Sequence, residues 1–194
     1  MSFSILVDSC CDLTPDMRRA PNICSIPLTI HVGGQDYVDD DLLDTSLLIC
    51  AMDQCPSASS TSCPSPGDYL EAYRNAEGDL FVVTLSALLS GSHNSAWQAK
   101  QLLLEEAPER NIHVFNSCSA SAGEVLVARK VWELAQQGLP FQTIVRRTEA
   151  YIADMNTLFA LENLDNLKKN GRLTKVQALL TGALRIKLVM GSTP

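Results

Sequence analysis

The sequence predicts an α/β fold, with a mostly parallel sheet flanked by helices and followed by the start of a second α/β domain. Five short apolar runs have the length of buried strands; they are residues 4–7, 26–32, 80–85, 112–115 and 158–161. Helical patterns separate most of these runs, and alternation of strands with helices is typical of parallel sheets covered on both faces.

The first half of the chain also shows a hairpin and a helix. Gly33-Gly34 separates the run 26–32 from Gln35-Asp36-Tyr37-Val38, which predicts a hairpin with a Gly-Gly turn. A helix is expected at 42–52, with Asp41 or Asp44 at its start. Residues 51–66 are rich in Ser, Pro and Cys, and we expect them to form a long irregular loop.

Four further helices are expected. The first, at 66–74, has Ser65 as N-cap, Pro66 at its first position and Asp68 three residues after the cap. The others are at 94–106, 119–137 and 140–153.

The pattern changes near residue 155. We therefore expect an N-terminal domain at 1–155 and the beginning of a C-terminal domain at 156–194, with helices at 164–172 and 175–184 and a strand at 186–190. One or two helices and two short strands make a poor independent core, so we expect the chain to be truncated.

Composition excludes several classes of protein. The net charge of −7 provides no basic stripe for nucleic acid. No apolar run approaches the roughly 20 residues of a membrane span, and the N-terminus does not have the pattern of a signal peptide. The seven cysteines form no CxxC pair, which favours free thiols, a cytoplasmic location and no metal site.

Two hydroxyl-rich segments are the main candidates for a binding site. One contains Thr61 and Ser62, and the other is Ser90-Gly91-Ser92; each precedes a predicted helix. The start of a helix leaves amide groups unpaired and carries a partial positive charge, which favours a phosphate or a carboxylate. The pattern therefore predicts an anion site.

Other polar residues follow predicted strands. Asp8 and Ser9 follow the first strand, and Ser117 follows the fourth. In a parallel sheet these positions meet at the edge where ligands bind, although such residues are also ordinary turn formers. Arg172 follows Asn170-Gly171 and could hold a carboxylate through two hydrogen bonds, or it could be a solvated surface residue.

A group of large apolar residues is expected in the core, with an apolar ligand tunnel as the alternative: Phe81, Leu85, Leu88, Leu89 and Trp97. Enzyme motifs are missing. The sequence has no G-x-S-x-G, no G-x-x-x-x-G-K-[ST] and no G-x-G-x-x-G, and no motif places a histidine beside a serine. Binding is therefore favoured over catalysis.

Taken together, these segments resemble the DegV family of bacterial fatty-acid-binding proteins. The matching segments are Ile5-Leu6-Val7-Asp8-Ser9, Ile26-Pro27-Leu28-Thr29-Ile30, Tyr37-Val38-Asp39, Ser60-Thr61-Ser62-Cys63-Pro64-Ser65-Pro66-Gly67, Leu88-Leu89-Ser90-Gly91-Ser92, Asn116-Ser117 and Leu167-Lys168-Lys169-Asn170-Gly171-Arg172-Leu173. Two of them depart mildly from the usual family pattern of Leu-Ser-Gly-Thr and Gly-Gly-Arg.

The resemblance implies two α/β domains with a long-chain fatty acid between them, no catalysis, no cofactor and no metal. It implies presentation of the acid to a separate fatty acid kinase. The implied carboxylate ligands are Thr61, Ser62, Ser90, Gly91, Ser92 and Arg172, with Asp8, Ser9 and Ser117 behind them.

Two alternatives stay open. One is an enzyme that acts on a small phosphate or carboxylate through Asp8 and Ser9. The other is a regulatory protein that senses acyl chains and contacts another protein.

Overall fold

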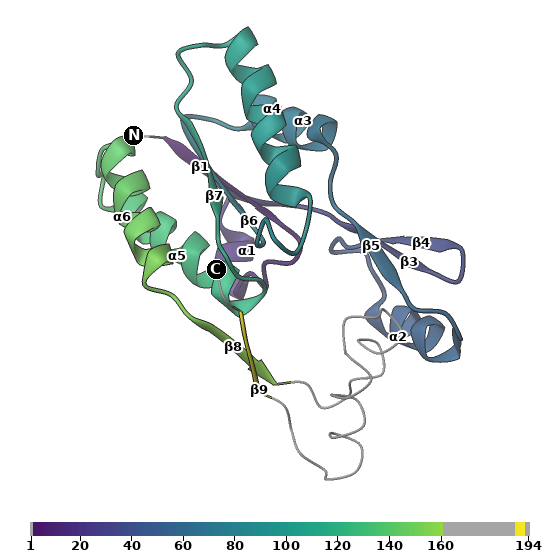
Figure 1. Ribbon diagram of the computed structural model, residues 1–194. Helices are drawn as coiled ribbons and strands as arrows, with labels where there is room; N and C mark the ends of the chain where they lie inside the picture. Colours follow the sequence, from purple (N-terminus) through teal and green to yellow (C-terminus); the bar gives the residue numbers. More distant parts are fainter. Residues whose placement is uncertain (1, 161–188, 193–194) are drawn as a thin grey trace. The chain divides into compact units, whose positions relative to one another are not determined.

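The structure is a computed structural model that describes residues 2–160 and 189–192 (Figure 1). Contacts between Cα atoms divide the chain into two compact units. The first contains Met1–Leu28 and Cys63–Met155, and the second contains Thr29–Ser62 and Asn156–Pro194. The first unit ends at the predicted boundary near residue 155, but residues 29–62 are grouped with the C-terminal residues. The division into domains at 1–155 and 156–194 stays a prediction.

A four-stranded parallel sheet forms the centre of the first unit. Its strands, in spatial order, are β2 (Ile23–Ile26), β1 (Phe3–Asp8), β6 (Asp79–Thr84) and β7 (Ile112–Asn116). The predicted α/β fold with a parallel sheet is therefore confirmed. All four strands end at the same edge of the sheet, where Asp8 closes β1.

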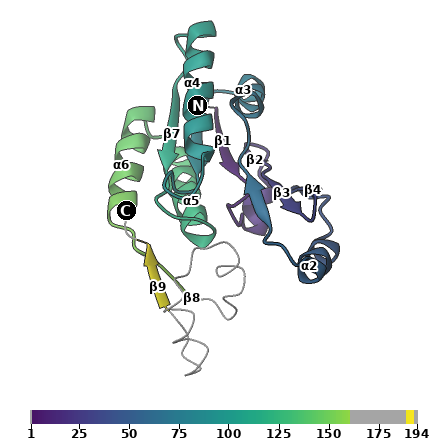
Figure 2. The ribbon, with the colours of Figure 1, turned by 45° about the vertical axis from the view of Figure 1, so that its right-hand side comes forward.

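Helices cover both faces of this sheet (Figures 1 and 2). On one face lie α3 (Pro66–Asn75) and α4 (Ser92–Glu106), whose buried residues share a core with one side of the strands. On the other face lie α1 (Pro15–Arg19), α5 (Ala122–Gln136) and α6 (Phe141–Ala153). No helix in residues 2–160 has both the length and the apolar composition needed to cross a bilayer.

The strands bury both of their faces, which explains their continuous apolar sequences. In β1, Ile5 and Val7 pack toward α5 and α6, whereas Leu6 packs toward α3 and α4. In β6, Phe81 packs toward α5 and α6, and Val82 packs toward α3 and α4. Successive side chains of a strand point to opposite faces, so a strand covered on both sides has no polar positions to alternate.

The second unit contains an antiparallel sheet with the order β4-β3-β5. Its strands are β3 (Thr29–Val32), β4 (Gln35–Val38) and β5 (Ser60–Ser62). The predicted hairpin is confirmed, because β3 pairs with β4 across Gly33 and Gly34, which have φ angles of 60° and 86°. Positive φ at both central residues is the conformation of a type I′ turn.

Three further elements complete the described part of this unit. Helix α2 (Thr45–Gln54) begins after Asp44, whose carboxylate accepts from the amides of Ser46 and Leu47. Asp44 is therefore the cap, not Asp41. Strands β8 (Thr157–Ala160) and β9 (Val189–Ser192) pair antiparallel. The helices predicted at 164–172 and 175–184 lie outside the described residues.

One strand prediction and one loop prediction were wrong. The run 26–32 is not one strand, because it is divided after Ile26 into β2 and β3, which belong to different sheets. Pro27 follows the break and has no amide hydrogen for a central strand. The loop expected at 51–66 contains β5, and α2 continues into it as far as Gln54.

Helix starts were predicted more accurately where a side chain marks them. Ser65 and Asp68 form the expected capping box, with each side chain accepting from the other residue's amide. Helix α4 starts at Ser92, two residues before the predicted position, and α5 starts at Ala122, later than predicted. Neither helix has a side-chain cap that would mark its first residue.

Candidate functional site

Asp8 is the centre of the carboxyl edge of the parallel sheet. It is fully buried, and its carboxylate accepts from the amide of Leu85 at 3.0 Å, the hydroxyl of Ser92 at 2.7 Å and the amide of Cys10 at 3.2 Å. Burial raises the pKa of Asp8, and these hydrogen bonds oppose the rise. Asp8 therefore holds the loop after β6 and the start of α4 against the end of β1.

Both the hydrogen and the oxygen of the Ser92 hydroxyl form hydrogen bonds within the protein. Its hydrogen goes to Asp8, so the Tyr69 hydroxyl, 2.7 Å away, must donate to the Ser92 oxygen. Ser92 and Tyr69 are fully buried, and burial raises the pKa of Tyr69 further above its ordinary value. The chain Tyr69–Ser92–Asp8 fixes the first turn of α4.

Ser90 is arranged differently. Its oxygen accepts from the Ser92 amide at 3.2 Å, and its side chain is half-buried. Because the amide occupies only the oxygen, the hydrogen of the Ser90 hydroxyl remains a donor for an anion. Gly91 is exposed, and a Cβ atom at this position would lie 3.1 Å from the Cys63 sulfur. The Ser90-Gly91 segment thus presents a hydroxyl and backbone amides beside a helix start without a side-chain cap.

Ser9 and Ser117 organise loops at this edge. The Ser9 hydroxyl oxygen accepts from the Leu28 amide at 3.0 Å. The Ser117 hydroxyl donates to the carbonyl of Ser119 and accepts from the Ser119 amide, at 3.1 and 3.2 Å. A position behind the ligand-contacting groups stays the prediction for both.

Glu124, which the sequence did not single out, is fully buried in the first turn of α5. Its carboxyl group interacts with that of Asp8 through a side-chain hydrogen bond that raises the pKa of Glu124 and lowers that of Asp8. Burial raises its pKa to about 10, and the nearby charge of Asp8 adds to the rise. Because Asp8 accepts three hydrogen bonds from other groups and the hydrogen bond between the two carboxyl groups raises the pKa of Glu124, the charge resides on Asp8 and the proton on Glu124.

The other hydroxyl segment lies in β5, where Thr61 and Ser62 are exposed. Ser62 is hydrogen-bonded to a residue that sequence reasoning missed. Its hydroxyl lies 2.7 Å from Nε2 of His31 in β3, and Nδ1 of His31 lies 2.6 Å from the carboxylate of Asp36 in β4. No sequence motif had indicated a histidine beside this serine.

Other predicted residues either lie outside the described part of the chain or are not buried as expected. Arg172 lies outside the described residues. The expectation of burial was right for Phe81 and Leu85 but wrong for three others: Leu88, Leu89 and Trp97 are 77%, 58% and 49% exposed. Leu88 and Leu89 belong to the loop between β6 and α4.

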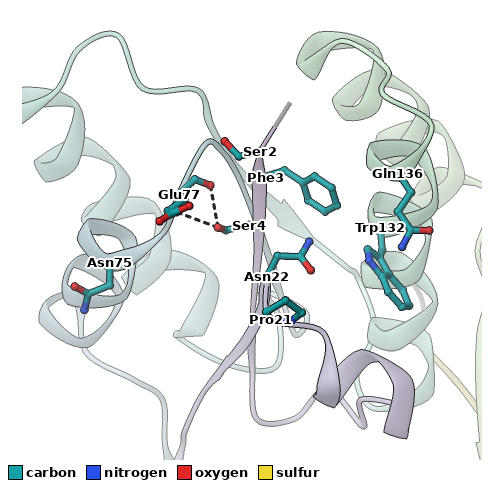
Figure 3. A pocket seen from close by; sticks show the side chains of 9 residues that line it. All are labelled: Ser2, Phe3, Ser4, Pro21, Asn22, Asn75, Glu77, Trp132 and Gln136. Atoms are coloured by element: carbon teal, nitrogen blue, oxygen red, sulfur yellow. Dashed lines mark hydrogen bonds between the residues drawn. The ribbon is translucent and has the colours of Figure 1, made fainter.

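A hollow of about 660 Å³ lies at the opposite end of β1, near Phe3, Trp132 and Gln136 (Figure 3). Two of its polar residues bond to each other: the Ser4 hydroxyl donates to the Glu77 carbonyl and accepts from the Glu77 amide. In open parallel sheets, ligands bind at the carboxyl ends of strands, so this hollow is a poor candidate. In the described part of the chain, no group of three or more His, Cys, Asp or Glu side chains could hold a metal ion.

The fold and the edge at Asp8 define an α/β protein whose helix α4 starts at this edge without a side-chain cap, and comparison with known proteins gives its family. The profile of the DegV family, described as uncharacterised, matches residues 2–193. A DegV domain-containing protein of Streptococcus pneumoniae is 42% identical over 191 residues, which are 97% of this chain and 68% of the relative. The chain belongs to the DegV family.

Solved structures of similar fold include other DegV family proteins. A DegV family protein from Ruminococcus gnavus, described with vaccenic acid, has a TM-score of 0.90 and 45% identity; the match covers 100% of this chain and 69% of that one. The Streptococcus pneumoniae Fatty Acid Kinase (Fak) B3 protein loaded with linoleic acid has a TM-score of 0.90, 41% identity and the same coverage. A Eubacterium eligens DegV protein loaded with heptadecanoic acid has a TM-score of 0.87 and 30% identity, over 99% of this chain and 68% of that one.

Proposed function

We propose that this protein binds a long-chain fatty acid and presents its carboxyl group to a separate fatty acid kinase. The observation that carries the proposal is that relatives of 41–45% identity and the same fold are described with bound fatty acids, one of them as a fatty acid kinase B protein. The free hydroxyl hydrogen of Ser90 supports it, because a carboxylate can only accept hydrogen bonds.

The residues divide by role. Ser90, the Gly91 amide, Thr61, Ser62 and Arg172 are the proposed contacts of the carboxylate. Ser92 was also predicted as a contact. Its hydroxyl already bonds to Asp8 and Tyr69, which supports a positioning role behind Ser90. Asp8, Ser9 and Ser117 support the loops. We also propose a cytoplasmic location, since Cys11, Cys24, Cys50, Cys55, Cys63 and Cys118 carry free thiols.

Extraction of the purified protein with organic solvent, followed by mass spectrometry, tests fatty-acid binding directly. An acyl chain should be recovered, and protein freed of lipid should take up added palmitate. Protein loaded with palmitate should then yield an acyl phosphate when it is mixed with a bacterial fatty acid kinase and ATP. If no acyl chain is recovered and no palmitate is taken up, the proposal fails.

Ser90→Ala tests the head-group contact. Loss of a hydrogen bond to a charged group costs about 1–3 kcal/mol, so palmitate affinity should fall about 5- to 150-fold. Ser95→Ala is the control, because Ser95 lies on the same helix, is nearly buried and contacts the Cys63 sulfur. An affinity equal to that of the wild type would remove Ser90 from the site.

An enzyme that uses Asp8 and Ser9 is the weaker candidate. Asp8 is fully buried and already accepts three hydrogen bonds, and the Ser9 oxygen accepts from the Leu28 amide. A group that transfers a proton to a substrate needs to reach it. Turnover of a small carboxylate or phosphate that is lost in Asp8→Asn would revive this candidate.

A further inference from the structure

A hydrogen-bonded chain of three side chains crosses the antiparallel sheet of the second unit. Asp36 on β4 contacts His31 on the central strand β3, and His31 contacts Ser62 on β5, at 2.6 and 2.7 Å. The His31 side chain is 33% exposed and that of Asp36 is 69% exposed. The chain therefore lies at the surface, where a ligand can reach the serine.

The positions of the protons follow from the partners. The Asp36 carboxylate can only accept, so Nδ1 of His31 carries a hydrogen. In the neutral imidazole, Nε2 is then an acceptor, and it takes the only hydrogen of the Ser62 hydroxyl. In the imidazolium form, Nε2 donates to the Ser62 oxygen, and the hydroxyl hydrogen is released for another acceptor.

This difference matters for a carboxylate ligand, which also can only accept. Ser62 can donate to it when His31 is protonated, but not while it donates to neutral His31. Of the two strands that flank β3, β4 contributes Asp36, the ionisable partner of His31, and Tyr37, whose hydroxyl donates to Gln35. Strand β5, Ser60–Ser62, contributes no ionisable side chain.

We propose that His31, oriented by Asp36, is a further head-group residue that enables Ser62 to donate to the fatty-acid carboxylate, so that binding is coupled to uptake of one proton by His31. The proposal rests on the proposed function, since it assigns a residue to the same carboxylate. Histidine is the side chain that ordinarily changes charge between pH 5 and 8. Because the bound form then carries one more proton than the free form, affinity should decrease as the pH rises.

The same three residue types form the triad of serine hydrolases, in which histidine removes the serine proton. In that triad the aspartate is buried, whereas Asp36 is largely exposed. Exposure lets water reach the pair, whereas a triad that forms an acyl-enzyme works in a site from which water is excluded. The geometry therefore favours recognition of a carboxylate over formation of an acyl-enzyme.

The test compares uptake of radiolabelled palmitate by the intact protein, from pH 5.5 to pH 8.5, with uptake by His31→Gln. Ionisation of palmitate itself affects both proteins equally, so the ratio of their affinities isolates His31. We expect the wild-type advantage to decrease about tenfold across the range, as linkage to one proton allows. His113→Gln is the matched control, because His113 pairs with Glu149 at 2.8 Å in the other unit.

The outcomes separate this proposal from the function on which it rests. No palmitate uptake at any pH would overturn both. Uptake by the wild type with the same pH dependence in His31→Gln would overturn only the role of His31. Should His31→Gln not fold, Asp36→Asn replaces it, and its affinity for palmitate should be lower than that of the wild type, because an amide at this position no longer fixes a hydrogen on Nδ1 of His31.

Two direct readouts complete the test. Binding of palmitate at pH 7.5 should take up a proton, measured as a dependence of the binding enthalpy on the ionisation enthalpy of the buffer, and His31→Gln should lose this dependence. Equal enthalpies in all buffers for the wild type would overturn the proposal. Release of nitrophenol from p-nitrophenyl palmitate that is lost in both Ser62→Ala and His31→Gln would assign the three residues to catalysis instead.

Discussion

Replacing Glu124 with glutamine is expected to make the protein more stable than the wild type at neutral and alkaline pH. The Glu124 carboxyl is fully buried beside the Asp8 carboxylate, and burial raises its pKa from 4.5 to about 10, with the charge of Asp8 adding to the rise. Between these values the folded protein retains a proton that the unfolded chain has released. The stability that this proton supports is fully present below pH 4.5 and is lost as the pH rises toward 10.

The expected size follows from the linkage relation. A shift of one pKa unit corresponds to about 1.4 kcal/mol, so the difference in unfolding free energy should change by about 2–4 kcal/mol in favour of Glu124→Gln between pH 5 and pH 8. Urea-induced unfolding at several pH values measures it. Glu133→Gln is the control on the same helix, because Glu133 is exposed and pairs with Arg129 at 3.2 Å. Parallel pH profiles for the wild type and Glu124→Gln would show that the carboxyl is already ionised in the folded protein.

The sequence predicted those parts of the fold that local patterns determine. The apolar runs of β1, β6 and β7 are long enough to identify buried strands, and parallel pairing follows from the helices between them. Strand β5 has three residues, Ser60–Ser62, and none is apolar. Its pairing with β3, about thirty residues earlier, has no signal within its own segment.

The candidate site shows the same limit. The hairpin at Gly33-Gly34 was predicted, and its register places His31 directly opposite Asp36, so this pair was within reach of sequence reasoning. Its link to Ser62 was not, because it depends on β5. Glu124 had the pattern of an ordinary acidic residue in the first turn of a helix. Its burial results from the packing of α5 on the sheet.

The hydroxyl segment at Ser90 was identified correctly as a helix start, but the roles within it required the structure. Ser90 and Ser92 have the same side chain and lie two residues apart, yet one is half-buried and the other fully buried. The difference arises because Asp8 and Tyr69 enclose Ser92, and they are 84 and 23 residues away in sequence. No pattern within the segment contains that information.

Replacing Ser92 with alanine is expected to lower the free energy of unfolding by about 2.5–6 kcal/mol. The substitution leaves the buried Tyr69 hydroxyl without an acceptor, which costs about 1–3 kcal/mol, and removes a hydrogen bond to the charged Asp8, which contributes about 1.5–3 kcal/mol. Thermal or urea unfolding measures the loss. Ser95→Ala on the same helix is the control and should cost much less, because Ser95 has only a long contact of 3.9 Å to a sulfur.

A double-mutant cycle with Tyr69→Phe distinguishes a connected network from separate contacts. Once Ser92 is alanine, removing the Tyr69 hydroxyl eliminates an unpaired buried group, so the double variant should be less destabilised than the sum of the single variants by about 0.5–3 kcal/mol. Tyr73→Phe is the matched control, because Tyr73 is equally buried on the same helix but donates to the Ala96 carbonyl at 2.9 Å. Its effect should add to that of Ser92→Ala.

The same variants separate the two roles of Ser92. If Ser92 only positions the helix start, Tyr69→Phe should weaken palmitate binding although its ring touches no ligand, and Tyr73→Phe should not. If Ser92 contacts the carboxylate directly, Ser92→Ala should weaken binding strongly while Tyr69→Phe leaves affinity unchanged. Because Asp8 holds the Ser92 hydroxyl hydrogen in the folded protein, we expect the first result.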